Sequence, residues 1–283
     1  MGEQGFSGQE IKEAVRSRYA KAIEQPSTGC CGSTPAQPVQ IEGSCCGTAT
    51  PPSMKGRMAG LAGYGEADLE SLPADAVQNS FGCGNPLAFA GVVTGETVLD
   101  IGSGAGIDCL SAAERVGPAG RVIGLDMTPE MIGRARRNAS EASVSNVEFR
   151  LGEAEKMPVE DASVDWVISN CVINLSPDKP AVFREIARVL RPGGCISISD
   201  IVAEALPTPI QRSRDAWTGC LAGAIGGPAY VQGLEAAGLR GVRVNSRIVY
   251  EVSQLAGLFA SSSCGCGPAG DADALARVAA GKI

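Results

Sequence analysis

Cysteine is the side chain in this sequence that is best suited to chemistry. The 283 residues include 11 cysteines and no histidine, so no imidazole is present to act as a general base or to bind a metal. Cys83 lies in FGCGNP, Cys171 in SNCVINL and Cys220 in WTGCLAGA. A free thiol has a pKa of about 8.5 and is a poor base near pH 7. Its thiolate is nevertheless a good ligand for soft metals and metalloids.

Cys83, Cys171 and Cys220 come from three distant parts of the chain, as the residues of a substrate site do. Structural zinc sites favour close pairs of cysteines, and the sequence contains no Cys-x-x-Cys. Three thiolates without a nitrogen ligand suit a thiophilic centre such as trivalent arsenic, which is trigonal and keeps one lone pair. We therefore expect these three cysteines to bind As(III). The alternative is that they fill the core, because free cysteine packs as a small hydrophobe.

The other cysteines have simpler explanations. Cys109 and Cys195 lie in apolar segments, and we expect both of them in the core. Two Cys-Cys pairs, at 30–31 and at Cys45 and Cys46, interrupt residues 25–53, whose Pro, Gly, Ser and Thr content is typical of a mobile linker. The pair at 30–31 and the two cysteines of the Gly-rich tail, at 264 and 266, either capture metal incidentally or deliver arsenic.

The segment from about residue 80 to 205 alternates between strands and helices. Apolar runs predict strands within residues 92–102, 121–127, 146–152, 164–175 and 193–202. Apolar residues at helical spacing predict helices within residues 107–116, 128–142 and 178–190. This alternation is typical of a parallel sheet that is covered by helices on both faces.

The flanking segments predict smaller units. The spacing of apolar residues predicts an amphipathic helix over 11–24 and a short helix near 66–72. After residue 205 it predicts helices over 207–225 and 230–239, and then one or two strands within 240–252. We therefore expect three parts: an N-terminal helix and linker over 1–79, an α/β domain over 80–205 and a C-terminal region over 206–283.

The run VLDIGSGAG, residues 98–106, predicts a strand that leads through a Gly-rich turn into a helix. Gly102 and Gly104 allow a sharp turn and a close approach of a ligand to the backbone. The spacing is G-x-G-x-G, whereas a dinucleotide site needs G-x-G-x-x-G. Asp100, just before the turn, would repel phosphate and suits a cationic ligand. Asp126 ends the next strand, where an acidic side chain can bind both ribose hydroxyls, and Met127 could pack on an adenine.

This segment resembles the cofactor site of class I methyltransferases that use S-adenosylmethionine, which implies a Rossmann-like α/β fold. The resemblance implies that Asp100, Gly102 and Gly104 line the methionine end of the cofactor and that Asp126 binds the ribose. It also implies that Gly152 and Glu153 lie near the adenine. Ligands of open α/β sheets bind outside the carboxyl ends of the strands. We therefore expect Asn170 and Cys171, at the end of the fourth strand, to face the same crevice.

Within that superfamily, the chain is similar over nearly its whole length to arsenite methyltransferases, especially the microbial ones. The blocks that carry this resemblance are FGCGNP, VLDIGSGAG, GLDMTPEM, SNCVINLSPDK and WTGCLAGA. It implies that Cys171 and Cys220 are the persistent arsenic ligands in a small α+β C-terminal domain. It implies that Cys83 and either Cys45 or Cys46 form transient disulfides as the methylated product is reduced, so that thioredoxin or glutathione is a partner.

Composition narrows the remaining function classes. The formal net charge of −7 argues against a general nucleic-acid or anionic-membrane surface. No apolar run reaches the roughly 18 residues of a membrane span, and the polar start is not a signal peptide. We expect a cytoplasmic monomer that methylates arsenite. The alternatives are a methyltransferase for a small carbon, oxygen or nitrogen acceptor, and a thiol-rich metalloid-binding protein without catalysis.

Overall fold

A parallel sheet forms the centre of the computed structural model, which describes residues 6–24, 59 and 62–247. Within those residues the sheet has five strands in the order β3-β2-β1-β4-β5, and every neighbouring pair is parallel. The strands are β1 (Thr97–Ile101), β2 (Arg121–Asp126), β3 (Val147–Leu151), β4 (Val164–Asn170) and β5 (Leu190–Ser199). The order reverses direction between β1 and β4, which is the point where such sheets bind ligands. The predicted Rossmann-like sheet is confirmed.

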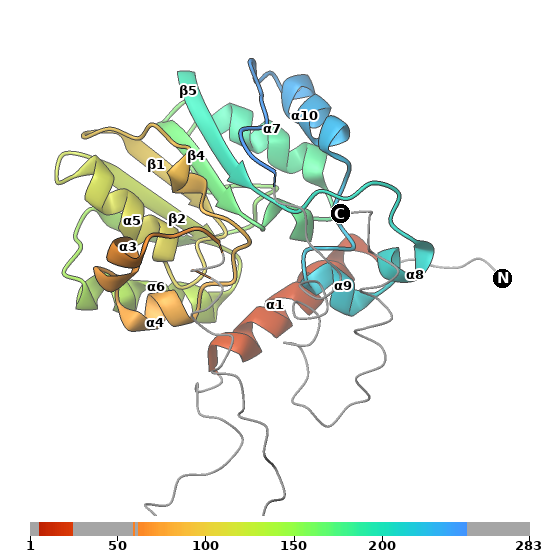
Figure 1. Cartoon of the computed structure of the whole chain (residues 1–283), viewed down its shortest axis with the longest axis horizontal. Helices are drawn as coiled ribbons and strands as arrows, with labels where there is room; N and C mark the ends of the chain where they lie inside the picture. The colour runs from red at the N-terminus through yellow and green to blue at the C-terminus, as the bar shows by residue number, and fades with distance from the viewer. Residues whose placement is uncertain (1–5, 25–58, 60–61, 248–283) are drawn as a thin grey trace, which may run out of the picture.

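Helices cover both faces of this sheet (Figure 1). One face carries α5 (Ile107–Val116) and α6 (Pro129–Glu141), and the other carries α7 (Lys179–Val189) and α10 (Gly227–Ala236). Side chains of β1 point alternately to the two faces, which explains why both faces are covered. Val98 packs with α5, whereas Leu99 packs with α7. Successive side chains of a strand point to opposite faces, so a strand buried on both sides reads as a continuous apolar run.

Close packing between β2 and its neighbours gives a first prediction. A methyl group added at Gly124, in the middle of β2, would lie 2.6 Å from Cδ1 of Phe149 and 2.8 Å from Sγ of Cys109. We expect Gly124→Ala to lower the free energy of unfolding by about 1–3 kcal/mol, because overpacking forces neighbours out of place. Urea denaturation measures this change. The control is Gly133→Ala in α6, where the nearest atom is 4.0 Å away and the free energy of unfolding should rise by roughly 0.5–1 kcal/mol. Equal effects of the two substitutions would contradict the prediction.

The remaining helices gather at the carboxyl end of the sheet and beside it. They are α1 (Gly8–Glu24), α3 (Glu66–Glu70), α4 (Ala74–Gln78), α8 (Thr208–Gln211) and α9 (Arg214–Thr218), with the short 3₁₀ turns η1 (Pro86–Ala88) and η2 (Ile173–Leu175). The predicted N-terminal helix is confirmed as α1, which contacts both α6 and α9. Figure 1 shows α1 next to α9, below the ends of the strands. No helix of the described residues is both long and apolar enough to span a membrane.

Three local predictions were wrong. Residues 207–225 do not form one helix, because the side chain of Ser213 accepts a hydrogen bond from the Ala216 N–H and starts a new helix, α9, after α8. Residues 240–247 form no strand in the described part of the chain, where they are mostly exposed. Residues 248–252 of that predicted strand lie outside the described residues. Cys109 is buried as expected, but Cys195 is exposed, because it lies on β5 at the edge of the described sheet.

The predicted division at residues 79 and 205 stays a prediction. So does the β part of the expected C-terminal α+β domain, because the described residues after 205 contain only helices and loops.

Candidate active site

A pocket opens at the carboxyl end of the sheet, between the Gly-rich turn, α1 and the segment after β3. The open space between its walls is about 990 Å3, including the part that is continuous with solvent. Six residues of the predicted cofactor site line it: Gly102, Gly104, Asp126, Met127, Gly152 and Asn170. Cys171 lines it as well. The sequence therefore predicted the place of the pocket, while the contacts of each residue with a cofactor stay predictions.

The Gly-rich turn forms the floor of the pocket. Gly102 has φ +77° and Gly104 has φ +53°, a left-handed region that favours glycine. The N–H groups of Gly102 and Ser103 donate to the Leu125 carbonyl oxygen at 2.7 and 2.9 Å, which ties the turn to β2. A methyl group at Gly102 would lie 2.1 Å from Cγ2 of Val172, the residue that follows Cys171. The turn and the loop after β4 thus approach each other as closely as glycine allows.

Asp126 closes the pocket at the end of β2. One carboxylate oxygen accepts a hydrogen bond from the Gly104 N–H at 3.0 Å, and the other accepts one from the Thr128 N–H at 2.8 Å. Burial raises the pKa of Asp126, and these backbone hydrogen bonds act in the opposite direction. Each oxygen keeps lone pairs toward the pocket, so the carboxylate can accept two further hydrogen bonds from vicinal hydroxyl groups.

Two residues predicted for the cofactor site are not among the described residues that line the pocket, so their contacts with a cofactor stay predictions. Asp100 is buried behind the turn, where its carboxylate accepts a hydrogen bond from Sγ of Cys109 at 3.3 Å. Burial, and then the charge of Asp108, raises the pKa of Asp100 well above its usual range. Glu153 is partly exposed and pairs with Nζ of Lys12, a wall residue, at 2.7 Å and with Arg16 at 3.5 Å. Neither residue belongs to the pocket walls in the described part of the chain.

Sequence reasoning missed several wall residues: Lys12, Tyr19, Ser103, Asp108 and Glu155. Lys12 and Tyr19 belong to α1. The sequence predicted this helix but did not indicate where it packs. Asp108 could have been found, because it stands in the first turn of the helix that follows the glycines. The hydroxyl oxygen of Ser103 is buried and has no hydrogen-bond partner among the described residues.

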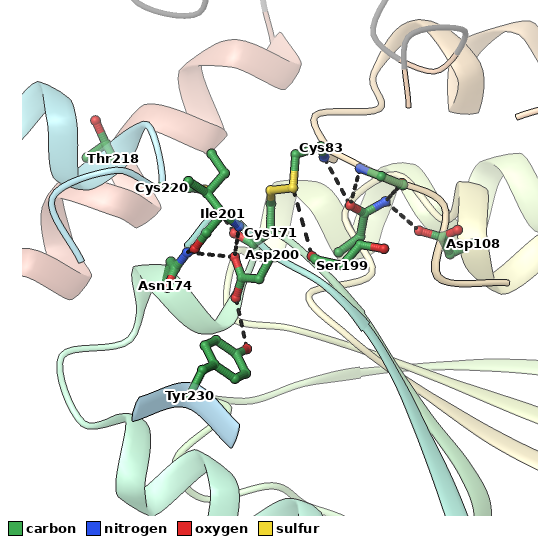
Figure 2. The surroundings of a disulfide bond; sticks show 12 residues. Cys83, Asp108, Cys171, Asn174, Ser199, Asp200, Ile201, Thr218, Cys220 and Tyr230 are labelled. Carbon is green, nitrogen blue, oxygen red and sulfur yellow. Dashed lines mark hydrogen bonds between the residues drawn. A yellow bond between two sulfur atoms is a disulfide. The ribbon is translucent and has the colours of Figure 1, made fainter. Parts of the chain in front are cut away.

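Three of the predicted cysteines meet where Cys171 lines this pocket. Cys83, in the turn before η1, forms a disulfide with Cys171, and their Cα atoms are 5.9 Å apart (Figure 2). Cys171 directly follows β4, and its N–H donates to the Ser199 carbonyl oxygen of β5 at 2.8 Å. Its φ of +61° is rare for a residue with a side chain and is kept only where the surroundings fix the backbone.

Cys220 lies against the same pair. Its thiol donates to the Cys171 carbonyl oxygen at 2.8 Å, and it too has a positive φ, of +64°. Its Sγ is 4.0 Å from the hydroxyl of Tyr19, so α1 touches both the pocket and this thiol. Burial, and then the charge of Asp200, raises the pKa of Cys220 to about 12. The side chain is therefore a neutral thiol near pH 7.

The structure brings together the three predicted arsenic ligands, but in a different state from the one expected. Cys83 and Cys171 are joined in a disulfide, so three thiolates would be present only after reduction. Among the described residues, no group of three His, Cys, Asp or Glu side chains is arranged to hold a metal ion. The ligand set stays a prediction for the reduced chain. Cys45 and Cys46 lie outside the described residues, as do the cysteines at 30, 31, 264 and 266.

A further carboxylate, that of half-buried Asp200, lies beside the cysteines just after β5 (Figure 2). It accepts hydrogen bonds from Nδ2 of Asn174 at 2.8 Å and from the hydroxyl of Tyr230 at 3.0 Å. Burial raises the pKa of Asp200 to about 7, although both hydrogen bonds and nearby Lys179 act to lower it. Sequence reasoning did not single out this residue.

Comparisons with known proteins find methyltransferases of similar sequence. A family model described as Methyltransferase domain matches residues 93–257. An arsenite methyltransferase of Halobacterium salinarum is 51% identical over 217 residues, which cover 76% of this chain and 54% of that protein. An arsenite methyltransferase of Aquipseudomonas alcaligenes is 40% identical over 153 residues, or 51% of this chain and 44% of that protein. The chain thus spans about half the length of the curated relatives it matches.

A solved structure is similar as well. It is the crystal structure of CrArsM, an arsenic(III) S-adenosylmethionine methyltransferase from Chlamydomonas reinhardtii. The TM-score is 0.56 and the sequence identity is 38%, over 61% of this chain and 60% of that chain.

Proposed function

The chain belongs to the methyltransferase-domain family, and from that membership we propose that it transfers methyl groups from S-adenosylmethionine to arsenite held by its own cysteines. One observation carries the proposal. Cys171 lines the pocket, is bonded to Cys83 and accepts the hydrogen bond of the Cys220 thiol on its carbonyl oxygen. Thiols that bind arsenic here would hold it beside the methyl donor.

The pocket residues fit S-adenosylmethionine, which would supply an electrophilic methyl group on a sulfonium. Asp126 can accept from both ribose hydroxyls, and the side chains of Met127, Met131 and Leu125 offer apolar contacts to an adenine. The unpartnered hydroxyl of Ser103 can donate to a carboxylate or accept from an amine. Three wall carboxylates, those of Asp108, Asp126 and Glu155, outnumber the one ammonium among the described wall residues, that of Lys12. This excess of negative charge suits a cationic ligand and disfavours a pyrophosphate.

The cysteines can bind arsenite without a general base. Each thiol that condenses with As(OH)₃ forms one As–S bond, and its proton leaves with the displaced hydroxide as water. The neutral state of Cys220 is therefore no obstacle, although its pKa is about 12. Arsenic keeps its lone pair, which is the nucleophile toward the methyl group. The residues then contribute positioning and exclusion of water, which are large effects in group transfer.

We propose that Cys83 and Cys171 also restore trivalent arsenic after methyl transfer. Transfer formally oxidises arsenic from As(III) to As(V), so two electrons must return to it. As the sulfurs of Cys83 and Cys171 join in the disulfide, their two As–S bonds break and one electron pair stays on arsenic. Water supplies a hydroxide to the open position and releases a proton, so trivalent methylated arsenic remains on Cys220. In this proposal Cys171 leaves arsenic in each turnover, in place of the persistent role that the resemblance implied. Either Cys45 or Cys46 would exchange with this pair, and thioredoxin or glutathione would then reduce the chain for the next turnover.

The test uses the whole chain with arsenite, methyl-labelled S-adenosylmethionine and excess dithiothreitol, followed by chromatographic separation of arsenic species. We expect labelled methylated arsenic that increases linearly with enzyme concentration. Binding of S-adenosylhomocysteine is measured on the same sample by calorimetry. Binding without methylated arsenic would contradict the proposed substrate and favour a small carbon, oxygen or nitrogen acceptor. Arsenite binding without binding of S-adenosylhomocysteine would favour a metalloid-binding protein without catalysis.

A further inference from the structure

The turn that carries Cys83 is bonded at three backbone groups to one side chain, the amide of Asn170. Its Oδ1 accepts hydrogen bonds from the N–H groups of Cys83 at 3.0 Å and Gly84 at 3.1 Å. Its Nδ2 donates to the Gly84 carbonyl oxygen at 2.5 Å. Two backbone donors on one atom fix the orientation of the amide, because only the oxygen can accept. Asn170 precedes Cys171 in the chain, so one residue places both halves of the disulfide.

Packing leaves this turn little freedom. A methyl group at Gly82 would lie 2.2 Å from Nδ2 of Asn170, and one at Gly84 would lie 2.8 Å from Cβ of Ser199. The two glycines of FGCGNP therefore let the backbone press against Asn170 on one side and β5 on the other. The position of the Cys83 sulfur depends on both contacts.

The same amide is tied to a buried carboxylate and a buried hydroxyl. Nδ2 of Asn170 lies 3.3 Å from Oδ2 of Asp108 and 3.2 Å from the hydroxyl of Tyr64. That hydroxyl donates to Oδ1 of Asp108 at 2.6 Å. Tyr64 and Asp108 are only 6% and 4% exposed, and buried networks of this kind are stronger than the same bonds in water. In Figure 2 a dashed line joins Asp108 to the amide that also bonds the turn of Cys83.

Asp108 also faces the pocket. Asp108, Asn170 and Gly82 all line its wall, and each oxygen of Asp108 keeps a lone pair beyond the one its partner uses. Burial raises the pKa of Asp108 to about 6, although the hydrogen bonds from Tyr64 and Asn170 act to lower it. The carboxyl is therefore mostly ionised at pH 7.5. A cationic group of a bound ligand would favour the ionised form further and strengthen both hydrogen bonds.

We propose that Tyr64, Asp108 and Asn170 form a positioning link that couples occupancy of the pocket by a cationic ligand to the placement of the Cys83 thiol against Cys171. The inference rests on the proposed function for the identity of that ligand, S-adenosylmethionine or S-adenosylhomocysteine, each of which carries an ammonium group. These residues act through the turn, so they change the redox equilibrium of the thiol pair and do not act on the methyl group that is transferred. Bound ligand should favour the disulfide, and the disulfide form should bind ligand more tightly by the same factor.

The experiment measures the redox equilibrium of the Cys83–Cys171 pair in the whole chain at pH 7.5. In a glutathione buffer the two thiols lose two electrons and two protons to glutathione disulfide, which becomes two glutathione thiols. After acid quench and alkylation, mass spectrometry of the Cys83 and Cys171 peptides gives the oxidised fraction with and without saturating S-adenosylhomocysteine. We expect the ligand to raise the equilibrium constant for the wild-type disulfide about fivefold to tenfold, within the usual range of coupling between sites.

Two variants remove the link at different atoms. Tyr64→Phe deletes the hydroxyl and Asp108→Asn deletes the charge, and we expect each to reduce the ligand effect to less than about twofold. The matched control is Tyr230→Phe, which removes another buried hydroxyl that donates to a carboxylate, that of Asp200. It should keep the wild-type ligand effect. Without ligand, Tyr64→Phe should already shift the pair toward the dithiol, and Tyr230→Phe should not.

Three results would overturn the inference. The wild-type equilibrium could be unchanged by saturating ligand, Tyr64→Phe could keep the full ligand effect, or Tyr230→Phe could lose it as well. If Asp108→Asn does not fold, Tyr64→Phe alone decides. No step of the measurement needs arsenite or methyl transfer. A chain that shows the ligand effect but does not methylate arsenite would therefore contradict the proposed substrate and leave this link intact.

Discussion

Replacement of Cys220 by serine lowers the rate of arsenite methylation by about two orders of magnitude or more, while S-adenosylhomocysteine still binds with nearly wild-type affinity. Serine has almost the same shape and can still donate to the Cys171 carbonyl oxygen, as the thiol does at 2.8 Å. What it loses is the soft sulfur ligand, since a hydroxyl binds As(III) far less well than a thiol. Arsenic held by fewer sulfurs is misplaced against the methyl donor, and misplacement by about 1 Å can cost a hundredfold.

The measurement compares initial rates of labelled methylarsenic formation at saturating S-adenosylmethionine. Cys195→Ser is the matched control, because Cys195 is exposed on β5 and belongs to neither the pocket nor the disulfide. It should keep the wild-type rate, whereas Cys171→Ser should fall as far as Cys220→Ser. A Cys220→Ser enzyme with near-normal rates would show that this cysteine is core filling, as its burial alone would suggest.

Much of the fold could be predicted from the sequence, because local patterns determine it. The sequences of β1, β2 and β4 are apolar at consecutive positions, and this pattern predicts strands that are buried on both faces. The helices α5, α6 and α7 place apolar residues at helical spacing and begin after Gly, Thr or Asp, with proline near the start of two of them. The break between α8 and α9 was missed because the cap at Ser213 competes with an otherwise continuous helical pattern.

The site was predictable only where a motif lies within one segment. The Gly-rich turn and Asp126 lie next to each other in the fold because β1 and β2 pair, with Asp100 opposite Gly124 and Ile101 opposite Leu125. The pairing of Cys83 with Cys171 joins residues 88 positions apart, and nothing local distinguishes it from other pairings of 11 cysteines. Tyr64 and Tyr19 reach the site only through tertiary packing, so their roles are visible only in the folded chain, whereas Asp108 follows the Gly-rich turn in the sequence and could have been found.

Removal of the Asp126 carboxylate should have the largest effect on cofactor binding. We expect Asp126→Ala to raise the Kd for S-adenosylhomocysteine about a hundredfold or more. The carboxylate orients the turn through the N–H groups of Gly104 and Thr128 and, in the proposed complex, accepts from two ribose hydroxyls. Hydrogen bonds to a charged group contribute about 1.5–3 kcal/mol each, and two of them at the lower limit already amount to roughly a hundredfold in Kd.

Calorimetric titration of each variant with S-adenosylhomocysteine measures this effect, and Asp165→Ala separates it from a general loss of stability. Asp165 also holds a backbone N–H, that of Thr97 at 2.8 Å, but at the amino end of the sheet, where its carboxylate pairs with Arg191. We expect its replacement to lower the melting temperature and to change the Kd less than about threefold, within the scatter of substitutions far from a site. Weakened binding in both variants would mean that the pocket responds to any loss of sheet stability. Unchanged binding in Asp126→Ala would mean that the ribose contacts another group, because a carboxylate that binds both hydroxyls cannot be removed without a loss of affinity.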